Sequence, residues 1–449
     1  MLGRMKWGWL SLAALLLAAG TLSQWMAPAE AAKSAVEAPE ESAANEADEG
    51  GVHMLGVSEE GKRFWPRWRG PSGQGWVEGD GYPVTWSSSE NVLWKVEVPG
   101  QGNSSPVVWG NHIYLTTAYE GGARRSILAF DRSDGSQVWE AFAPADPNNA
   151  RAYPKNGYAS STPATDGERI YAYMGGHGLV AVDLQGKIAW TAPLGDVSRA
   201  FHGTAGSPLL YKDKVILYQD LPDNAFIAAF NKETGQEIWR TSREGRVGWG
   251  TPVAIDAGDR AEIIVSSNRA VNAYDPETGE ELWRCGGNTF EVIPTPVVGH
   301  GLIFCSSGRA GPTLAIRPGG SGDVTETHVE WRAAKGSPFV PSPILHNDLL
   351  YMVNDMMSIL TVYEAQSGDL VYQARMGKPV REGFSSSPVA LDGKLFFTND
   401  EGQTYVVEAG REYKLLHTNE LGERVLASPA LVDGTWYWRT QNHLLAIGN

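Results

Sequence analysis

The sequence predicts an all-β fold: an eight-bladed β-propeller of four-stranded antiparallel blades. Three observations predict it. A Ser-Pro or Thr-Pro dipeptide recurs eight times at nearly even intervals, the same order of strand and turn signals follows the copies, and the last repeat lacks one strand that the segment before the first repeat can supply. A ring of such units can close on itself and form one large domain.

The dipeptide repeat sets the period of the fold. Its prolines are Pro106, Pro163, Pro208, Pro252, Pro296, Pro343, Pro388 and Pro429. The intervals between them are 57, 45, 44, 44, 47, 45 and 41 residues. A period in the low-to-mid forties is typical of four-stranded propeller blades.

Each repeat reads as four short strands. An apolar run follows the proline, a Gly, Asp or Asn turn leads into a second run, and a strand with small residues precedes a Thr-Gly or Ser-Gly turn, as at Thr234-Gly235. Asp and Asn bond locally in such turns, and Gly supplies positive φ. A tryptophan then follows, which we expect to lock one blade onto the next through its large buried area and its indole N–H. The expected docking residues are Trp94, Trp139, Trp190, Trp239, Trp283 and Trp331, with Tyr372 as a weaker copy.

The two ends of the propeller sequence complement each other. After Pro429 only three strand-like runs remain, whereas the run from Asn91 to Val98 precedes the first repeat and carries Trp94. We expect this early strand to complete the last blade, which removes the exposed sheet edges that favour aggregation.

The first 60 residues are expected to lie outside the propeller. Residues 1–32 read as a signal peptide, with Arg4 and Lys6 before an apolar run from Leu10 to Ala19; an uncleaved membrane anchor is the alternative, but the run is shorter than the roughly 20 residues of a span. Residues 33–60 hold eight acidic residues against one lysine, and we expect a disordered acidic linker. The propeller then occupies 61–449, and the protein is expected to be periplasmic or secreted, without a transmembrane span in the mature chain.

The net charge and the cysteine content narrow the range of possible functions. The formal net charge of −15 makes a nucleic-acid partner unexpected, because phosphate binding needs a basic face. The two cysteines, Cys285 and Cys305, either pair in an oxidising compartment or stay as buried free thiols. We expect neither a nucleophilic nor a metal-binding cysteine.

The pattern Ala-x-Asp-x-x-Thr-Gly-x-x-x-Trp resembles the tryptophan docking motif of PQQ-like β-propeller repeat proteins, seen at Ala273 to Trp283. This family includes the quinoprotein alcohol dehydrogenases and the lipoprotein scaffold of the outer-membrane barrel-assembly machinery. The stretches Trp65 to Pro71, Arg309 to Gly320 and Leu426 to Pro429 are similar to secreted bacterial PQQ-binding-like propellers. The resemblance covers about Trp65 to Asn449 and implies the fold. The dehydrogenases characteristically carry two adjacent cysteines beside the cofactor, and this chain has none, so no catalytic residue is transferred.

Two sets of loops meet at one face of a propeller: the connections that enter the inner strands, and the loops between the second and third strands. They are expected to line a polar funnel with several aromatic groups, which suits a small polar ligand or a peptide. The ligand-binding candidates are Asn103, Tyr158, His177, His202, Asp220, Trp249, Arg269, Arg309, Asp355, Arg381 and Asp400. The same loops carry Tyr119, Glu291, Phe384 and Asn442. His202 and Trp249 stand out because glycines flank them, although a hydrogen-bonded structural role is the ordinary alternative for a histidine.

Three functions remain open from the sequence. The first is a non-catalytic, exported binding or scaffold propeller, expected to be monomeric and to engage a protein, peptide or glycan partner without a cofactor. The second is a quinoprotein dehydrogenase that uses PQQ and Ca²⁺ to oxidise an alcohol or a sugar. The third is a hydrolase or lyase that uses acidic residues of the funnel. Hydrolysis by a carboxylate pair, such as Asp220 with Asp223 or Asp355 with Asp400, requires a separation of about 5 to 9 Å.

Overall fold

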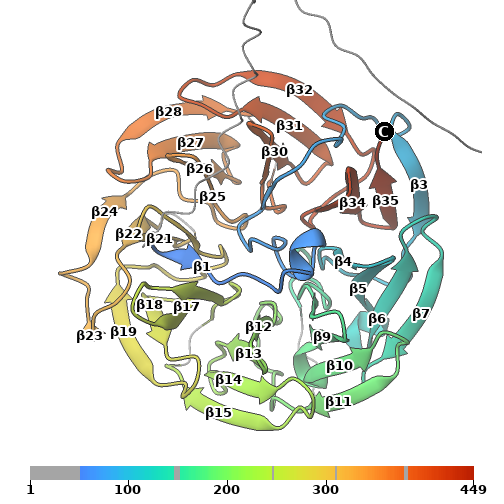
Figure 1. Ribbon diagram of the computed structural model, residues 1–449, viewed down its shortest axis with the longest axis horizontal. Helices are drawn as coiled ribbons and strands as arrows, with labels where there is room; N and C mark the ends of the chain where they lie inside the picture. Colours follow the sequence, from blue (N-terminus) through green and yellow to red (C-terminus); the bar gives the residue numbers. More distant parts are fainter. Residues whose placement is uncertain (1–50, 146–151, 245–246, 309–310, 379–382) are drawn as a thin grey trace, which may run out of the picture. The chain divides into compact units, whose positions relative to one another are not determined.

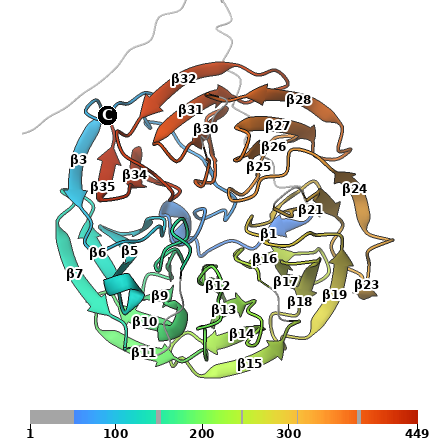
Figure 2. The same cartoon turned by 180° about the vertical axis from the view of Figure 1, so that it is seen from behind.

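The computed structural model describes residues 51–449 except 146–151, 245–246, 309–310 and 379–382. Eight antiparallel sheets form the blades of a β-propeller, as the sequence predicts, and they follow one another around a ring (Figure 1). The same ring is seen from behind in Figure 2. The short strands correspond to the apolar runs of the sequence. Gly, Asn and Asp residues with positive φ lie in turns between them.

The strands of each blade run from the inner to the outer edge of the ring. Blades 1 and 2 contain β4 (Val107–Trp109), β5 (His112–Tyr119), β6 (Arg124–Asp131), β7 (Gln137–Phe142), β8 (Ala164–Thr165), β9 (Arg169–Tyr173), β10 (Leu179–Asp183) and β11 (Ile188–Ala192). Blades 3 and 4 contain β12 (Leu209–Tyr211), β13 (Lys214–Gln219), β14 (Phe226–Asn231), β15 (Glu237–Ser242), β16 (Val253–Asp256), β17 (Ala261–Ser266), β18 (Ala270–Tyr274) and β19 (Glu281–Gly286). Blades 5 and 6 contain β20 (Val297–Gly299), β21 (Leu302–Ser306), β22 (Thr313–Ile316), β24 (Val329–Ala333), β25 (Ile344–His346), β26 (Leu349–Asn354), β27 (Ile359–Glu364) and β28 (Leu370–Arg375). Blade 7 contains β29 (Val389–Leu391), β30 (Lys394–Thr398), β31 (Gln403–Glu408) and β32 (Leu415–Glu420), and blade 8 contains β33 (Ala430–Val432), β34 (Thr435–Arg439), β35 (His443–Ile447) and β3 (Val92–Glu97).

Blade 8 closes the ring with strands from both ends of the propeller sequence. β3 pairs antiparallel with β35, and Trp94 lies opposite Ala446. The early strand therefore completes the last blade, as the sequence predicts. Three short 3-10 helices, η1 (Gly61–Arg63), η2 (Glu120–Gly122) and η3 (Gly175–His177), are the helical elements of the described residues. None of them has the length and apolar character needed to cross a membrane.

A ring of hydrogen bonds joins all eight blades through the residue before each repeat proline. The backbone N–H of every one of these residues donates to the side-chain hydroxyl of its counterpart in the next blade, at 2.8 to 3.4 Å, and the last blade donates to the first. We call this ring the hydroxyl belt; its members are Ser105, Thr162, Ser207, Thr251, Thr295, Ser342, Ser387 and Ser428. A proline follows each belt member, and the inner strand of each blade begins directly after that proline.

The docking tryptophans join the blades at the outer edge. Five indole N–H groups donate to backbone carbonyls in the next blade: Trp94 to Arg132, Trp139 to Leu184, Trp190 to Lys232, Trp239 to Pro276 and Trp331 to Ala365, at 2.8 to 3.2 Å. Each ring covers the turn glycine of that neighbour. A Cβ on Gly235 would lie 2.5 Å from Trp190, so the turn needs glycine both for this close approach and for its φ of +72°.

Trp283 is the exception among these tryptophans. Its indole N–H donates to Glu262 Oε2 at 2.9 Å, inside its own blade. The connection between β22 and β24 is longer than in the other blades and folds back as β23 (Gly322–Asp323), which pairs parallel with β19 at Trp283. The extra strand covers Trp283 completely and takes the place of the usual docking turn.

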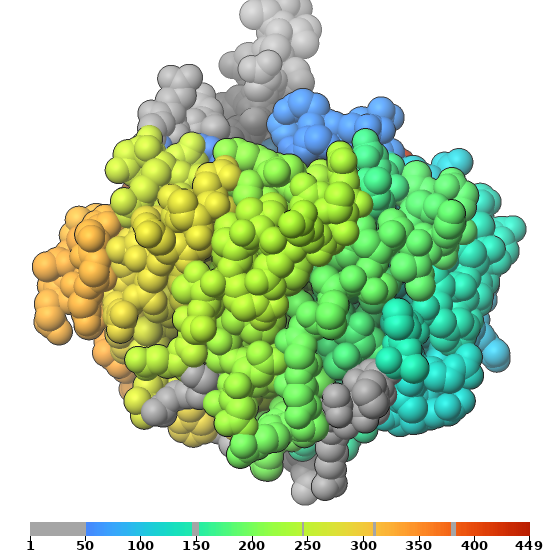
Figure 3. Space-filling model, turned by 90° about the horizontal axis from the view of Figure 1, so that it is seen from below, coloured from blue at the N-terminus to red at the C-terminus, as the bar shows by residue number. Residues whose placement is uncertain are grey.

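The segment from residue 51 to Val77 crosses one end of the central channel. β1 (His53–Met54) pairs with inner strand β16, β2 (Trp76–Val77) pairs with inner strand β29, and Trp65 exchanges backbone hydrogen bonds with Val108 of β4. We call it the floor segment. It lies on one face of the ring (Figure 3). β1 falls within residues 33–60, for which the sequence predicts a disordered acidic linker.

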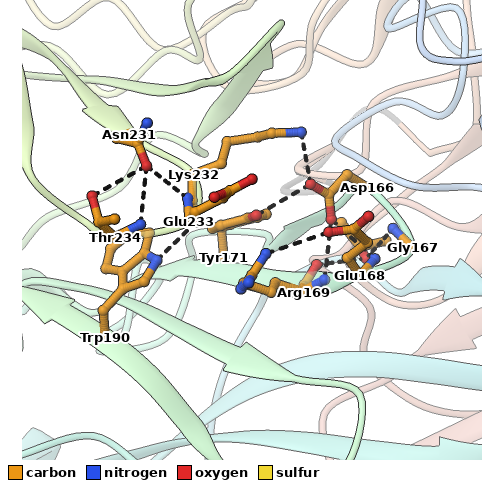
Figure 4. A network of polar contacts seen from close by, with 11 residues as sticks. Asp166, Gly167, Glu168, Arg169, Tyr171, Trp190, Asn231, Lys232, Glu233 and Thr234 are labelled. Carbon is orange, nitrogen blue, oxygen red and sulfur yellow. Dashed lines mark hydrogen bonds and ion pairs between the residues drawn. The ribbon is translucent and has the colours of Figure 1, made fainter.

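A polar network ties blades 2 and 3 together beside one docked tryptophan (Figure 4). Lys232, in the turn that accepts Trp190, reaches back to Asp166 with a Nζ–Oδ2 distance of 2.8 Å. Tyr171 also donates to Asp166 Oδ2 at 3.1 Å. Burial opposes ionisation of Asp166, but Lys232 and two backbone N–H groups outweigh it and lower the pKa of this carboxyl.

Candidate functional site

A cavity of about 420 Å³ occupies the channel on the side where the connections enter the inner strands. Seven of the eight belt residues line it, from Ser105 to Ser387. The floor segment closes the far end: the side chain of Trp68 lines the cavity and its indole donates to Thr295 Oγ1 at 3.1 Å.

Three aromatic side chains form one wall of the cavity. The ring of His202 lies 5.3 Å from that of Tyr153 and 5.8 Å from that of Trp249. The indole N–H of Trp249 donates to Gly203 O at 3.0 Å, which fixes the ring next to His202. On another side, Phe339 contributes a further aromatic surface.

A buried ion pair stabilises the loop that carries Trp249. Asp220 and Arg243 form two hydrogen bonds of 2.7 and 3.1 Å, with side chains only 2% and 7% exposed. Asp220 also forms an isolated backbone bridge with Gly248, the residue before Trp249. The pair thus holds the loop that presents the tryptophan.

Charged groups gather on the side of the cavity formed by blades 1, 6 and 7. Lys155 lines the cavity and pairs with Asp400 at 2.8 Å. Asp355 also lines it, is 3% exposed, and accepts the backbone N–H of Phe339 at 2.9 Å. Burial, together with the charge of Asp400, raises the pKa of the Asp355 carboxyl against the opposing effects of that hydrogen bond and of Lys155. Glu291 and His202 also line the cavity, and Glu291 Oε1 lies 3.9 Å from His202 Nε2.

Five exposed apolar side chains belong to residues that line the cavity or stand next to lining residues in the sequence. Tyr153 and Met356 line the cavity and are 54% and 62% exposed. Phe201, Phe290 and Met357 are 76%, 54% and 52% exposed and each follows or precedes a lining residue. We call these five residues the apolar collar. The other large exposed apolar residues lie in outer strands, such as Leu415 in β32.

The sequence-predicted candidates separate into three groups. Asn103, His202, Trp249 and Asp355 line the cavity, as does Glu291, and Asp400 contacts it through Lys155. Arg309 and Arg381 lie outside the described residues. The others do not line this cavity, and they are Tyr158, His177, Asp220, Arg269, Tyr119, Phe384 and Asn442.

The residues of the last group have structural partners where the contacts are defined. The His177 ring bonds to backbone carbonyls of Pro144 and Gly122, which is the ordinary structural role of a histidine. The Tyr158 ring lies beneath the guanidinium of Arg125. Arg269 adopts a positive φ of 74° in the hairpin between β17 and β18.

Sequence reasoning missed Trp68, Tyr153, Lys155 and Phe339. The signal for Tyr153 and Lys155 was present in the first interval of 57 residues, which is the longest between repeat prolines and leaves room for a loop over the cavity. Trp68 lies in the stretch from Trp65 to Pro71, which precedes the repeats, so no repeat pattern indicates that it reaches the channel.

Neither cysteine belongs to the cavity. Cys285 and Cys305 are free thiols, fully buried in the apolar core between blades 4 and 5. Burial raises the pKa of Cys285 to about 11 and raises that of Cys305 as well. Of the two outcomes left open by the sequence, the structure has the free thiols.

The chain is similar to known β-propeller proteins in sequence pattern and in fold. The family model described as outer membrane protein assembly factor BamB matches residues 76–196 and 223–309. BamB from Moraxella catarrhalis superposes with a TM-score of 0.56 at 12% identity, covering 79% of this chain and 96% of that one. Quinohemoprotein alcohol dehydrogenase from Comamonas testosteroni gives a TM-score of 0.63 at 13% identity, covering 86% and 80%. At these identities the likeness concerns the fold alone.

A curated relative is similar in sequence over a long stretch. Tetrathionate hydrolase from Acidithiobacillus ferrooxidans is 22% identical over a 371-residue alignment that covers 77% of this chain and 64% of that protein. The chain thus spans less than two thirds of the length of this relative. In its repeats and its docking tryptophans, the chain is similar to the PQQ-like β-propeller repeat proteins.

Proposed function

We propose that this chain is an exported, non-catalytic binding propeller that takes an extended peptide segment of a protein partner at its central cavity. The observation that carries the proposal is the apolar collar around a cavity with aromatic walls. Export rests on the leader-like residues 1–32, and the matched family model concerns an outer-membrane assembly factor.

The collar favours a peptide over a glycan. Phe201, Phe290 and Met357, each next in sequence to a lining residue, expose apolar surface rather than hydrogen-bonding groups, and exposed apolar surface beside a cavity favours an apolar partner. Methionine adapts to partners of different shape, which suits peptide recognition. The cavity volume of about 420 Å³ accommodates an anchoring side chain with its backbone.

The polar groups of the cavity support binding rather than bond breaking. Lys155 is held by Asp400, and the belt hydroxyls at Thr162 and Ser207 accept backbone N–H groups. Nucleophilic catalysis by a hydroxyl needs a base that accepts its proton, and a backbone N–H that donates to the hydroxyl oxygen cannot serve as that base.

Selection from random peptides displayed on phage tests the proposal. Enriched peptides are expected to share an apolar or aromatic anchor and to lose about tenfold or more in affinity on Trp249→Ala, as for a buried aromatic hot spot. Leu415→Ala, which removes an equally apolar exposed residue from an outer strand, is the matched control and should leave binding unchanged. Absence of enrichment, equal binding by Trp249→Ala, or binding to a glycan array instead would contradict the proposal.

The alternative is a PQQ and Ca²⁺ dehydrogenase, which we do not propose. Across the described ranges, His, Cys, Asp and Glu side chains form no group of three or more placed to hold a metal ion. The two cysteines lie in a blade core, away from the cavity. Calorimetric titration with PQQ and Ca²⁺, coupled to an artificial electron acceptor and a panel of alcohols and sugars, checks this reading: saturable binding with dye reduction would overturn it.

One observation favours hydrolysis as a second candidate. Asp355 is a buried cavity carboxyl with a raised pKa, the property of a general acid or base, and a relative is named tetrathionate hydrolase. Incubation with tetrathionate tests it directly. Consumption by the wild type but not by Asp355→Asn would support hydrolysis, and no consumption by the wild type would remove this candidate.

A further inference from the structure

Arg69 lies in the floor segment as a buried cation without a partner. Arg69 is 2% exposed, and its Nε, Nη1 and Nη2 atoms are buried without a hydrogen-bond partner. Its backbone has a φ of 60°, an uncommon conformation for a residue with a side chain. Burial lowers the pKa of the guanidinium to about 9, which still leaves it charged at neutral pH.

Other buried arginines of the described chain have their charge or their donors satisfied. Arg67, two residues earlier, donates to the carbonyls of Leu55, Gly70 and Pro71. Arg439 donates to Ser104 Oγ and Thr116 O at 2.6 and 2.7 Å, and Arg243 pairs with Asp220. A buried ion without such compensation costs several kcal/mol, so the contrast at Arg69 points to a missing partner.

The surroundings of Arg69 place it close to the hydroxyl belt. A Cβ on Gly75 would lie 3.0 Å from Arg69 Nη2 and 2.8 Å from the carbonyl of Pro388, the residue after belt member Ser387. The preceding residue, Trp68, bonds to belt member Thr295. Each belt oxygen accepts a backbone N–H, so its own hydrogen remains available to donate to an anion.

We propose that Arg69 binds a small monovalent inorganic anion inside the channel, between the floor segment and the hydroxyl belt. The guanidinium is enclosed by protein, and a monovalent ion neutralises it without the much larger dehydration cost of a divalent oxyanion. This structural anion site is independent of the peptide-binding proposal, because it lies in the floor of the channel.

The test compares the stability of the full mature protein in sodium chloride and in sodium gluconate at equal ionic strength. Binding to the folded state raises Tm by mass action, so chloride is expected to give a saturable rise of about 2 °C or more. Arg69→Gln should remove this chloride-specific rise. Arg63→Gln, at an exposed arginine of the same segment, is the matched control and should keep it.

Direct detection keeps the proposal falsifiable even if Arg69→Gln does not fold. A crystal soaked in bromide is expected to show an anomalous peak at the Arg69 guanidinium. Equal Tm values of the wild type in chloride and gluconate, a bromide-free guanidinium surrounded by ordered water only, or an undiminished chloride effect in Arg69→Gln would each overturn the assignment.

Discussion

The contact between each docking tryptophan and the next blade is open to a quantitative test at Gly279. An added Cβ would lie 2.4 Å from the Trp239 ring, and the residue has a φ of +76°. Forcing alanine into that conformation costs about 1 kcal/mol, and overpacking against a docked ring adds about 1–3 kcal/mol. We therefore expect Gly279→Ala to lower the free energy of unfolding by about 2–4 kcal/mol, measured by urea unfolding with tryptophan fluorescence.

Two other glycines separate the contributions. Gly301 has a φ of +74° with open space around its Cβ position, so Gly301→Ala should show the backbone cost alone. Gly410 has open space and no positive φ, and Gly410→Ala should be neutral or slightly stabilising. In a Trp239→Leu background the cost of Gly279→Ala should fall toward that of Gly301→Ala. Equal costs at Gly279 and Gly301 in the wild-type background would refute the docking account.

Three further predictions concern the belt, the network of Figure 4 and the thiols. Ser342→Ala removes the acceptor of the buried Thr295 N–H and should destabilise by about 1–3 kcal/mol in urea unfolding, whereas Ser342→Thr should retain most of the stability; equal loss in both would contradict the belt. Lys232→Met should lower the free energy of unfolding by about 1 kcal/mol at pH 7. Because the pKa of Asp166 is lowered in the folded state, the stabilisation by the Lys232–Asp166 pair is present above the unfolded pKa of about 3.9 and is lost as pH falls through the folded pKa. A Tm difference from wild type that persists at pH 2 would argue against the pair. Both cysteines should resist a thiol reagent in the native protein and react after unfolding, since burial raises their pKa values; no reactive thiol after unfolding without reductant would show a disulfide instead.

The sequence predicts the ring well because propeller repeats mark the residues that join blades. The residue before each repeat proline belongs to the hydroxyl belt, and the docking tryptophans contact the turn glycines of the next blade. The behaviour of Trp283 was not foreseeable in the same way. It depends on a two-residue strand, β23, whose pairing comes from tertiary contacts rather than from a hydrophobic pattern.

The candidate site is less accessible from sequence, because loop position does not fix side-chain direction. His202 lies in a connection that enters an inner strand and His177 lies between a second and a third strand, and both loop sets are expected to line one funnel. Yet His202 lines the cavity, whereas His177 bonds to backbone carbonyls. Trp68 reaches the cavity only because the floor segment pairs with inner strands far along the chain. Such long-range pairing leaves no local signal in the sequence.

Hydrogen–deuterium exchange of the protein with and without a selected peptide tests the binding account most directly. The account predicts slower exchange in the connections that carry the cavity wall and the apolar collar, within residues 152–160, 201–206, 289–293 and 354–358. The floor segment and outer strands such as β32 should be unchanged. Protection confined to the outer strands, or no protection at the cavity mouth by a peptide that binds, would contradict a peptide site at the centre of the propeller.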